Sequence, residues 1–551
     1  MNHNLSGWAR WRLPVTGVIL AAVLCLAVVP GPALSGSAYD PGDHLSDIEL
    51  LGKYVFFDKI STPTRMSCAT CHDPDTGGTG SVSGVNLHQV AVTGANPHTS
   101  GNLKPPTNMY ATLIEPFQPC TTGGLGRNSY CGGNFWDGRA EGLDTALFPA
   151  ATRHIGNEVF YKTDGNPLAS GVWEHAKYFG PVSDQALNPM PNPVEQNISR
   201  QAACQLVEKA KYAPLYKTIW GVDIDCSDTP VAVKAGDVSE ERAFDITYKR
   251  LMLAVGAWQG SEDLNSFSSK IDNTLRAELA CACAGFGTGV TVTPDPETCA
   301  VVQSYLNPAV CTHEDYLNSP GEFPLAGLTE QENLGHDLFF GATSTLNPTG
   351  KNANCAGCHS DRPPRAPNAP PLDDGTELFQ DYAADDYHNI GTPRNPEVPQ
   401  VLNADGSISD PDLGIAGHIG VNRPGFFKTP TVRNVDKRKG EGFIKAYAHN
   451  GWFKSLESIV HYYNTAFLGS TTIPYEQTTA YLFGITRCPP EITTEREALA
   501  ANCWPEPAYR PNTMPNFVGN LKLTAEEEAA IVAYMKALTD SHTAKAPKPY
   551  K

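Results

Sequence analysis

The stretch Cys68-Ala69-Thr70-Cys71-His72 returns with one substitution as Cys355-Ala356-Gly357-Cys358-His359. Two thiols three positions apart on a helical turn can each bond one vinyl group of a porphyrin, and the histidine that follows then lies under the iron. A zinc site would need four ligands close together, and no second pair of cysteines or histidines lies near either run. We therefore expect two covalently bound c-type haems. The expected attachment residues are Cys68, Cys71, His72, Cys355, Cys358 and His359, with His72 and His359 as iron ligands.

The residues before each run are also similar. Leu51-Gly52-Lys53-Tyr54-Val55-Phe56-Phe57 precedes the first run, and Leu334-Gly335-His336-Asp337-Leu338-Phe339-Phe340 precedes the second. Both stretches predict an amphipathic helix that ends in aromatic residues and is followed by a loop. The spacing between the two runs is far longer than the period of a solenoid repeat. It predicts two related haem domains, residues 39–275 and 325–545, joined by a cysteine-rich linker at residues 276–324.

Helical signals dominate the rest of the chain. Residues 238–261 have apolar positions at helical spacing after the start signal Val238-Ser239-Glu240-Glu241, and residues 456–463 predict a further helix. A last helix is expected to run to Leu538 behind a capping box formed by Thr524 and Glu527. Strand signals are few. The expected fold is mainly α, with two cytochrome c-like haem domains that carry cysteine-bearing loop insertions.

The first 38 residues have the pattern of a secretory signal peptide. Arg10 and Arg12 precede an apolar run at residues 15–29, and small residues follow, with cleavage expected after Ala33 or Ala38. The run is short for a membrane span, and no later stretch is long and apolar enough for one. We therefore expect an exported, periplasmic protein whose mature chain does not span a membrane.

Cysteine usage agrees with export. Of the 15 cysteines, one lies in the predicted signal peptide and four lie in the haem runs, so the other ten are available for disulfides. The pairs that proximity predicts are Cys120–Cys131, Cys204–Cys226 and Cys488–Cys503, with Cys281, Cys283, Cys299 and Cys311 pairing among themselves.

The chain is acidic, with a formal net charge of −18. This charge argues against nucleic acid as a partner, because phosphate backbones are bound by lysine and arginine. It would attract a small basic electron carrier, although an acidic surface also simply keeps a protein soluble.

With these elements in order, the sequence resembles the bacterial di-haem cytochrome c peroxidase family, which includes the protein-modifying enzyme MauG. The resemblance covers about residues 45–275 and 325–540. The motifs that carry it, besides the two haem runs, are Phe135-Trp136-Asp137-Gly138-Arg139, Asp184-Gln185-Ala186-Leu187-Asn188-Pro189 running to Pro193-Val194-Glu195, Lys428-Thr429-Pro430-Thr431-Val432-Arg433-Asn434, and His449-Asn450-Gly451.

The resemblance implies a division of labour between the haems. The N-terminal haem would react with hydrogen peroxide at an accessible sixth position, and the six-coordinate C-terminal haem would handle electrons. The implied activity is reduction of peroxide to water with electrons from a small cytochrome c or a copper protein. One alternative is a MauG-like oxidase that modifies residues of a partner protein, and another is a pure electron-transfer cytochrome with both irons closed. A homodimer is one assembly that the resemblance allows.

The resemblance also implies catalytic residues. Glu195 stands at the position of the acid–base residue that moves a proton between the oxygens of peroxide, with Gln185 and Pro189 at matching spacing. Trp136 matches the tryptophan between the two haems, which relays an electron or a hole. The alternatives are that Glu195 is a solvated loop carboxylate and that Trp136 is a core residue.

The remaining iron ligands are open at this stage. Some family members close the N-terminal iron with a loop histidine, for which His88 and His98 compete. The C-terminal iron takes methionine in the family and tyrosine in its MauG-like members. Counting forward from Leu456-Glu457 selects Tyr463, and counting back from Thr524 selects Met514. We prefer Tyr463, because it belongs to an uninterrupted segment, and its alternative role is that of a core aromatic.

The family also has a calcium site between the haems, which uses an asparagine in an Arg-Asn-x-Pro segment. The corresponding segment here is Asn102-Leu103-Lys104-Pro105-Pro106-Thr107, with Lys104 where that asparagine is expected. The substitution argues against calcium, whereas Thr429 and Thr431 still offer oxygens.

Overall fold

The computed structural model describes residues 44–120, 129–142, 154–232, 241–275, 325, 327–360, 380–383, 386–398, 401–402, 408–409, 413–466, 485–509, 518–519 and 521–550. All of them belong to one compact unit, Asp40–Lys551. The predicted signal peptide, the whole predicted linker with its four cysteines, and Met514 lie outside the described residues.

The described chain is mainly helical, as predicted, and its strands are two or three residues long. The α-helices are α1 Asp47–Phe57, α2 Ser83–Leu87, α3 Pro181–Ala186, α4 Arg200–Glu208, α5 Ala213–Trp220, α6 Ala243–Gln259, α10 Glu330–Phe340, α11 Ile415–Ile419, α12 Leu456–Thr465, α13 Glu495–Ala500 and α14 Ala525–Ala537. The strand pairs are β1 Gln118–Cys120 with β2 Ser129–Cys131, β3 Tyr387–His388 with β6 Phe427–Lys428, β4 Val401–Leu402 with β5 Ile408–Ser409, and β7 Thr486–Arg487 with β8 Cys503–Trp504; only the last pair is parallel.

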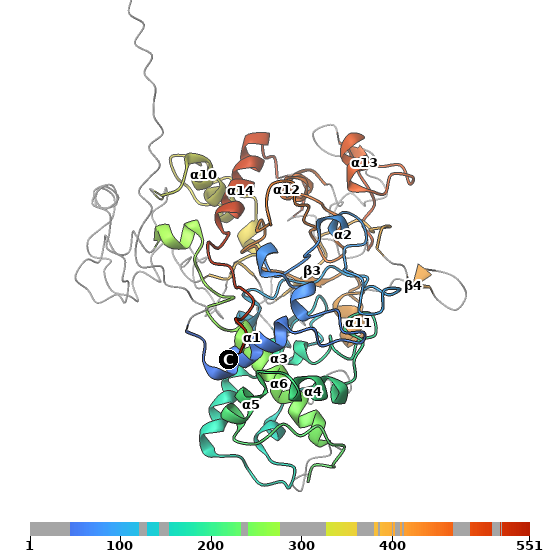
Figure 1. Cartoon of the computed structure of the whole chain (residues 1–551). Helices are drawn as coiled ribbons and strands as arrows, with labels where there is room; N and C mark the ends of the chain where they lie inside the picture. The colour runs from blue at the N-terminus through green and yellow to red at the C-terminus, as the bar shows by residue number, and fades with distance from the viewer. Residues whose placement is uncertain are drawn as a thin grey trace, which may run out of the picture. The chain divides into compact units, whose positions relative to one another are not determined.

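Each predicted helix before a haem run forms and packs against a longer helix from later in its own half of the chain. Figure 1 shows α1 beside α6 and α10 beside α14. Both crossings are closest at the glycine of the repeated Leu-Gly pair. A Cβ atom on Gly52 would lie 1.8 Å from the carbonyl oxygen of Ala254, and one on Gly335 would lie 2.0 Å from that of Ala530. The two helix pairs therefore share one packing solution, in which backbone meets backbone.

The helix predicted for residues 238–261 begins later than its start signal suggested. It runs from Ala243 to Gln259, and residues 238–240 lie outside the described residues. The backbone just before it pairs with another segment, because Val231 N–H donates to Glu241 O and Ala243 N–H donates to Thr229 O, both at 2.9 Å. The start signal predicted a helix at residue 241, where the described backbone is instead paired with residues 229–231. The predictions for α12 and for α14, including the Thr524–Glu527 capping box, are confirmed.

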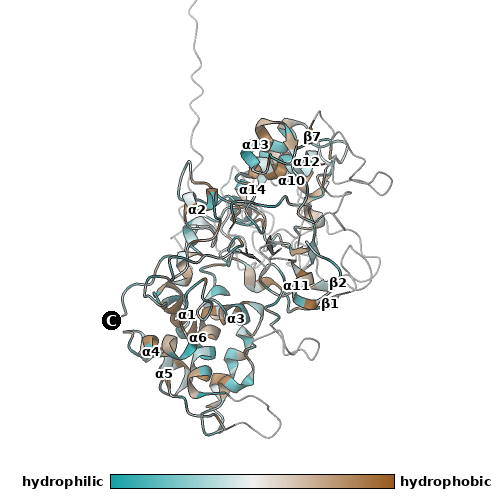
Figure 2. Cartoon of the chain, turned by 90° about the vertical axis from the view of Figure 1, so that its right-hand side faces the viewer, coloured by the Kyte–Doolittle hydropathy of each residue, from teal (hydrophilic) through white to brown (hydrophobic). Residues whose placement is uncertain are grey.

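Buried apolar side chains form two main clusters, and the hydrophobic stretches of the chain are brown in Figure 2. One cluster surrounds α1 and α6, and the other surrounds α10, α12 and α14. Because each cluster contains the helix pair beside one haem run, each run has a hydrophobic core of its own. The boundaries of the two haem domains remain a prediction.

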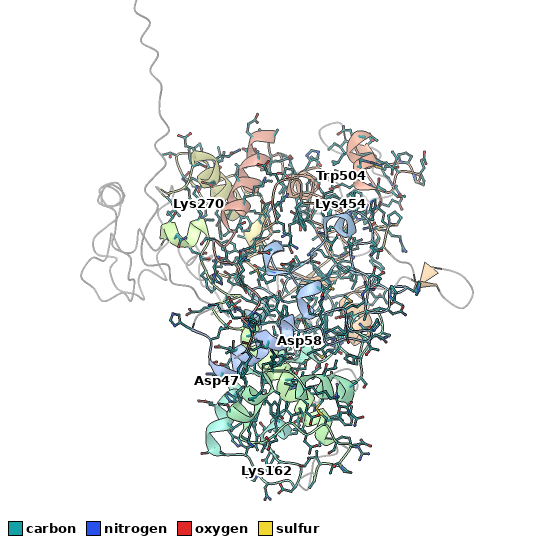
Figure 3. The ribbon with its side chains drawn as sticks, viewed as in Figure 1. Asp47, Asp58, Lys162, Lys270, Lys454 and Trp504 are labelled. Carbon is teal, nitrogen blue, oxygen red and sulfur yellow. A yellow bond between two sulfur atoms is a disulfide. The ribbon has the colours of Figure 1, made fainter. Side chains whose placement is uncertain are left out.

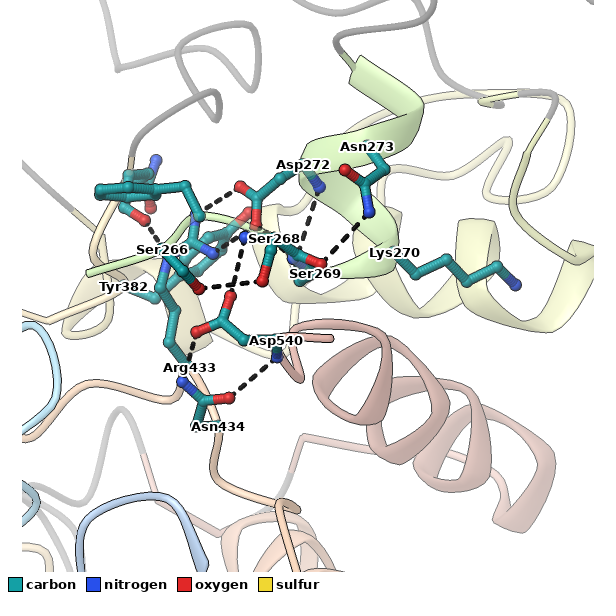
Figure 4. Close-up of polar contacts among 12 residues, drawn as sticks. Ser266, Ser268, Ser269, Lys270, Asp272, Asn273, Tyr382, Arg433, Asn434 and Asp540 are labelled. Atoms are coloured by element: carbon teal, nitrogen blue, oxygen red, sulfur yellow. Dashed lines mark hydrogen bonds and ion pairs between the residues drawn. The ribbon is translucent and has the colours of Figure 1, made fainter. Parts of the chain in front are cut away.

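A buried polar network joins the two halves of the chain (Figure 4). Arg433 donates through both terminal nitrogens to the carboxylate of Asp272, each at 2.8 Å, and neither side chain is exposed. Beside this pair, Asp540 accepts hydrogen bonds from Asn434 Nδ2 at 2.6 Å and from the backbone N–H of Ser268 at 2.9 Å. Since a charge of this kind is stable in the interior only when it is paired, the network fixes the segment after residue 430 against the end of the N-terminal half.

The C-terminal tail returns to the N-terminal half. Ala544 is buried in the cluster around α1 and α6. Tyr54 Oη donates to the carbonyl oxygen of Lys548 at 2.7 Å, and His542 Nε2 lies 2.9 Å from Asp263 Oδ1. Residues 542–548 thus pack against α1 and against the segment that carries Asp263.

Lysines from the C-terminal half bind backbone carbonyls of the segment after the first haem run. Lys454, labelled in Figure 3, donates to the carbonyl oxygen of Asn86 at 2.9 Å. Lys445 is 4% exposed and donates to the carbonyl oxygens of Thr76 and Lys437 at 2.9 and 2.8 Å. These contacts hold the loop beside the first haem run in place.

Three predicted disulfides are present: Cys120–Cys131, Cys204–Cys226 and Cys488–Cys503. The paired cysteines are 11, 22 and 15 residues apart in the sequence, respectively. None of the helices in the described part of the chain combines the length and the apolar character that a membrane span requires.

Candidate active site and haem cavities

The first haem run forms a tight turn. Cys68–Thr70 is a short 3-10 helix, and the backbone N–H groups of Cys71 and His72 both donate to the carbonyl oxygen of Cys68. His72 Nδ1–H donates to the carbonyl oxygen of Gly78 at 3.0 Å. This bond fixes the tautomer and leaves Nε2 free to bind a metal. Burial lowers the pKa of His72, so the ring is neutral, as an iron ligand must be.

This turn lines a cavity with about 1230 Å³ of space between protein atoms, part of it open to solvent. We call it the first cavity. It brings together the predicted residues Cys68, Cys71, His72, Trp136, Gln185, Pro189 and Glu195. Residues from α6 line it at helical spacing, namely Met252, Val255 and Gln259. The helical spacing of these residues could be read from the sequence. Which face of α6 meets the haem turn is seen only in the structure, where α6 crosses α1.

Glu195 is half-buried in the loop between α3 and α4. Asn192 Nδ2 donates to its Oε1 at 2.6 Å, and the carbonyl oxygen of Glu195 accepts from the N–H of Ala95 at 2.6 Å. Burial raises the pKa of Glu195, against the opposing effects of the Asn192 hydrogen bond and the positive charge of Arg139. A carboxyl group held in this way can exchange a proton at higher pH than an ordinary glutamate can.

The last turn of α3 carries Gln185, which lines the first cavity. Its neighbour Asp184 is buried and fixes this turn, because its carboxylate accepts from the backbone N–H groups of Gly142 and Ile155, both at 2.9 Å. Asp184 therefore anchors the helix, and Gln185 faces the cavity. The anchoring role of Asp184 and the contact of Asn192 with Glu195 were not predicted.

The second haem run repeats the geometry of the first. Cys355–Gly357 is a short 3-10 helix, and the N–H groups of Cys358 and His359 both donate to the carbonyl oxygen of Cys355. His359 Nδ1–H donates to the carbonyl oxygen of Pro430 at 3.0 Å, which again leaves Nε2 free. Burial lowers the pKa of His359 to about 4.

These residues line a second cavity, with about 1430 Å³ of space between protein atoms, part of it open to solvent. Tyr463 lines it together with Leu456, Ile459 and Val460, so all four lie on one face of α12. Burial, followed by the charges of Cys358 and Cys355, raises the pKa of Tyr463. The structure thus brings Tyr463, one of the two predicted ligands, into the same cavity as His359.

Trp136 lines both cavities and is 6% exposed. Its Nε1–H donates to the carbonyl oxygen of Lys104 at 2.7 Å, and the N–H of Lys104 donates to the carbonyl oxygen of His449 at 2.8 Å. His449 lines the second cavity, where its ring stacks on Phe427 with 3.5 Å between the ring centroids. Trp136 therefore lies between the two cavities as a buried residue, and its role as a relay stays a prediction.

The two loop histidines that were predicted to compete for the first iron do not line the first cavity. His88 has a side chain that is 66% exposed, with Nδ1 3.5 Å from Glu397 Oε1, and His98 is exposed. The structure therefore brings neither histidine together with His72.

The segment that resembles the calcium site does not fit a divalent cation. Lys104 Nζ donates to Thr79 Oγ1 at 2.8 Å, so an ammonium already uses an oxygen of this segment. Thr431 Oγ1 donates to the carbonyl oxygen of Asp381 and accepts from the N–H of Arg433. Among the described residues, no group of three or more His, Cys, Asp or Glu side chains is placed to hold a metal ion.

Both cavities fit a covalently attached haem. In each, two cysteines outside any disulfide line one space with a histidine whose Nδ1–H donates to a backbone carbonyl. Burial raises the pKa of the Cys68 and Cys355 thiols to about 12, so these thiols are neutral in the absence of a metal or a thioether bond. The walls are largely apolar, as the faces of a porphyrin require.

Comparisons with known proteins agree with this geometry. The family model described as di-haem cytochrome c peroxidase matches residues 46–280. The methylamine utilization protein MauG of Paracoccus denitrificans (strain Pd 1222) is 24% identical over 530 residues, which cover 95% of each chain. The solved structure of the diheme peroxidase BthA from Burkholderia thailandensis E264 has a TM-score of 0.52 and 19% identity over 92% of this chain and 90% of that chain. A variant of the same peroxidase matches with a TM-score of 0.52 and 18% identity. The predicted resemblance is confirmed, and the chain is similar to the di-haem cytochrome c peroxidase and MauG proteins.

Proposed function

We propose that this protein reduces hydrogen peroxide to water at the first cavity, with electrons that enter through the second cavity. The observation that carries the proposal is the presence of Glu195 and Gln185 in the same cavity as His72. A haem bound there would supply the iron that binds peroxide and passes electrons to it. We further propose that the protein works in the periplasm, after removal of residues 1–38.

The residues of the first cavity move the protons. Glu195 would accept a proton from one oxygen of a peroxide in the first cavity and return it to the other oxygen, which would leave as water. Burial raises its pKa, and Asn192 holds the carboxyl group at a fixed position. Gln185 carries an amide that can donate a hydrogen bond to peroxide or to the water that replaces it.

Electrons would reach this site through Trp136. The indole lies between the cavities, and its hydrogen bond to Lys104 fixes its orientation. The overall reaction consumes two electrons and two protons for each peroxide and gives two waters. The electrons would come from a small cytochrome c or a copper protein, which the acidic chain would attract if the carrier is basic.

A second candidate is MauG-like oxidation of residues in a partner protein. The observation that favours it is Tyr463 in the second cavity, because a phenolate ligand distinguishes MauG-like members from those with methionine. The same Glu195 and Trp136 would serve this reaction. A pure electron-transfer role is less well supported, because neither His88 nor His98 lines the first cavity.

Two measurements test the proposal. A pyridine haemochrome assay should give two haems per chain, and a value of one or none would refute the haem assignment. A steady-state assay with peroxide and a panel of reduced carriers should then show turnover. Rapid reaction with peroxide but no turnover with any carrier would favour the protein-modifying candidate, and no reaction with peroxide would leave the electron-transfer role.

A further inference from the structure

Two polar side chains in the wall of the first cavity have no part in the proposed reaction. Lys104 and Asn108 both line this cavity, four residues apart on one segment. The segment is held at several points, because Lys104 binds Trp136 and His449 through its backbone and Thr107 Oγ1 donates to the carbonyl oxygen of Gly77 at 2.7 Å. Its side chains are therefore presented to the cavity from a fixed position.

The ammonium of Lys104 lacks a counter-charge. Its Nζ donates to Thr79 Oγ1 at 2.8 Å and lies 3.4 Å from the carbonyl oxygen of Pro105. An ammonium has three donors, so at least one stays available. No carboxylate of the described chain pairs with it, and burial lowers the pKa of Lys104 to about 7 with no opposing group. A buried cation is costly unless an anion pairs with it, which indicates that the cavity receives an anion.

Asn108 points to the same conclusion independently. It is 5% exposed, and neither its Nδ2 nor its Oδ1 has a hydrogen-bond partner. Buried amides are almost always paired, so this one is expected to bind a group that enters the cavity. The amide lies close to the haem turn, because a Cβ atom on Gly78 would be 2.2 Å from Asn108 Oδ1, and the carbonyl oxygen of Gly78 is the acceptor for His72.

We propose that Lys104 and Asn108 form the binding site for a propionate carboxylate of the haem in the first cavity. A carboxylate matches both side chains, since it accepts a charge-assisted hydrogen bond from an ammonium and a second bond from an amide N–H. The thioether bonds to Cys68 and Cys71 leave the two propionates as the negative groups of the cofactor. The inference rests on the proposed function only in requiring a haem at this site, and it does not depend on peroxide as the substrate.

The interaction has a consequence for the first haem. A positive charge fixed near its propionate offsets negative charge near the iron and so favours the reduced state. The backbone carbonyl oxygen of Lys104 also accepts the indole N–H of Trp136. Lys104 therefore contacts the proposed electron path through its backbone, and its ammonium would influence the potential of the haem that receives the electrons.

The test replaces Lys104 with methionine, which keeps the length of the side chain and removes its charge. The holoprotein is titrated spectroelectrochemically, and resonance Raman spectra record the bending bands of the propionates. Lys104→Met should lower the midpoint potential of the first haem by about 59 mV or more, which is a tenfold change in a one-electron equilibrium, and should shift a propionate band. Lys104→Arg should restore both, and Asn108→Leu should shift the band and lower the potential less.

Lys454→Met is the matched control, because Lys454 is a largely buried lysine whose ammonium binds backbone carbonyls and does not line the cavity. It should lower the midpoint of thermal unfolding without moving a propionate band. The inference is overturned if Lys104→Met keeps both haems, the parent potential and the parent bands. If Lys104→Met does not fold, parent spectra in Asn108→Leu overturn it instead. A purified parent protein without haem would contradict the proposed function rather than this inference.

Discussion

The two haem cavities share their supporting structure and differ in the polar groups that complete them. Each is built from a C-x-x-C-H turn beside a helix crossing that is closest at a glycine, Gly52 in the first half and Gly335 in the second. The first cavity then receives Glu195 from a loop, whereas the second receives Tyr463 from α12. The comparison teaches that both halves repeat the turn and the helix crossing, whereas the polar side chains that distinguish the two cavities come from outside the repeat.

A second difference lies in the histidines. His72 donates to Gly78, six residues farther along the chain, whereas His359 donates to Pro430, 71 residues away. The first turn therefore orients its own ligand. The second depends on the segment that Arg433 and Asp272 hold in place.

The largest expected effect comes from replacing Glu195, the carboxylate that lines the first cavity and not the second. Glu195→Gln should keep both haems and slow peroxide cleavage by about 100-fold or more, because the amide cannot take and return a proton. Reduction and reoxidation of the second haem should keep their parent rates, since Glu195 does not line that cavity. The measurement is stopped-flow reaction with peroxide, and cleavage at the parent rate would make Glu195 an ordinary loop carboxylate.

A second substitution tests whether the two crossings are equivalent. Gly52→Ala and Gly335→Ala should each lower the free energy of unfolding by about 1–3 kcal/mol or more, because the added Cβ would overlap a backbone carbonyl that cannot move freely. Gly84→Ala in α2 is the control, since nothing lies within 4 Å of its Cβ position. Denaturant titration measures all three, and a large loss for only one crossing would show that the repeat is not symmetric in energy.

A third prediction concerns Tyr463, the predicted iron ligand that lines the second cavity and not the first. Tyr463→Phe should change the absorption and electron paramagnetic resonance signals of the second haem and leave those of the first unchanged. Tyr462→Phe is the neighbouring control, because Tyr462 Oη donates to the carbonyl oxygen of Gly391 and lies outside the cavity lining. It should cost about 1 kcal/mol of stability with no spectral change. Unchanged spectra in Tyr463→Phe would remove tyrosine as the ligand.

The smallest effect is a pH dependence confined to the first cavity. Burial raises the pKa of Glu195, so its protonated form persists to higher pH than in an ordinary glutamate. Because the shuttle must first accept a proton, the rate of peroxide cleavage should fall as the pH falls through this raised pKa and level off above it. A rate profile of parent and Glu195→Gln checks the assignment, which fails if both proteins show the same acidic limb.

Much of this architecture follows from local sequence patterns. The haem turns, the helices before them, the last helix and the three short disulfide loops depend on residues close together in the chain, and they form as predicted. Glu195 and Tyr463 could be named from a resemblance to known proteins. The structure places each in its predicted cavity, while their roles there are still to be tested.

Features that depend on distant segments could not be predicted in this way. The acceptor of His359 comes from residue 430, and the junction of Trp136, Lys104 and His449 joins three segments through backbone atoms, which leave no pattern in side-chain types. The late start of α6 has the same origin, because a backbone pairing with residues 229–231 competes with the first helical turn. The unpartnered amide of Asn108 is visible only once burial is known.

The return of the C-terminal tail to α1 bears on the order in which the protein is completed. Synthesis proceeds from the N-terminus, yet the cluster around α1 and α6 includes Ala544, and Tyr54 uses the carbonyl oxygen of Lys548 as its acceptor. The first region to emerge is therefore the last to close. Until residues 542–548 have been synthesised, Tyr54 on α1 and Asp263 lack these hydrogen-bond partners.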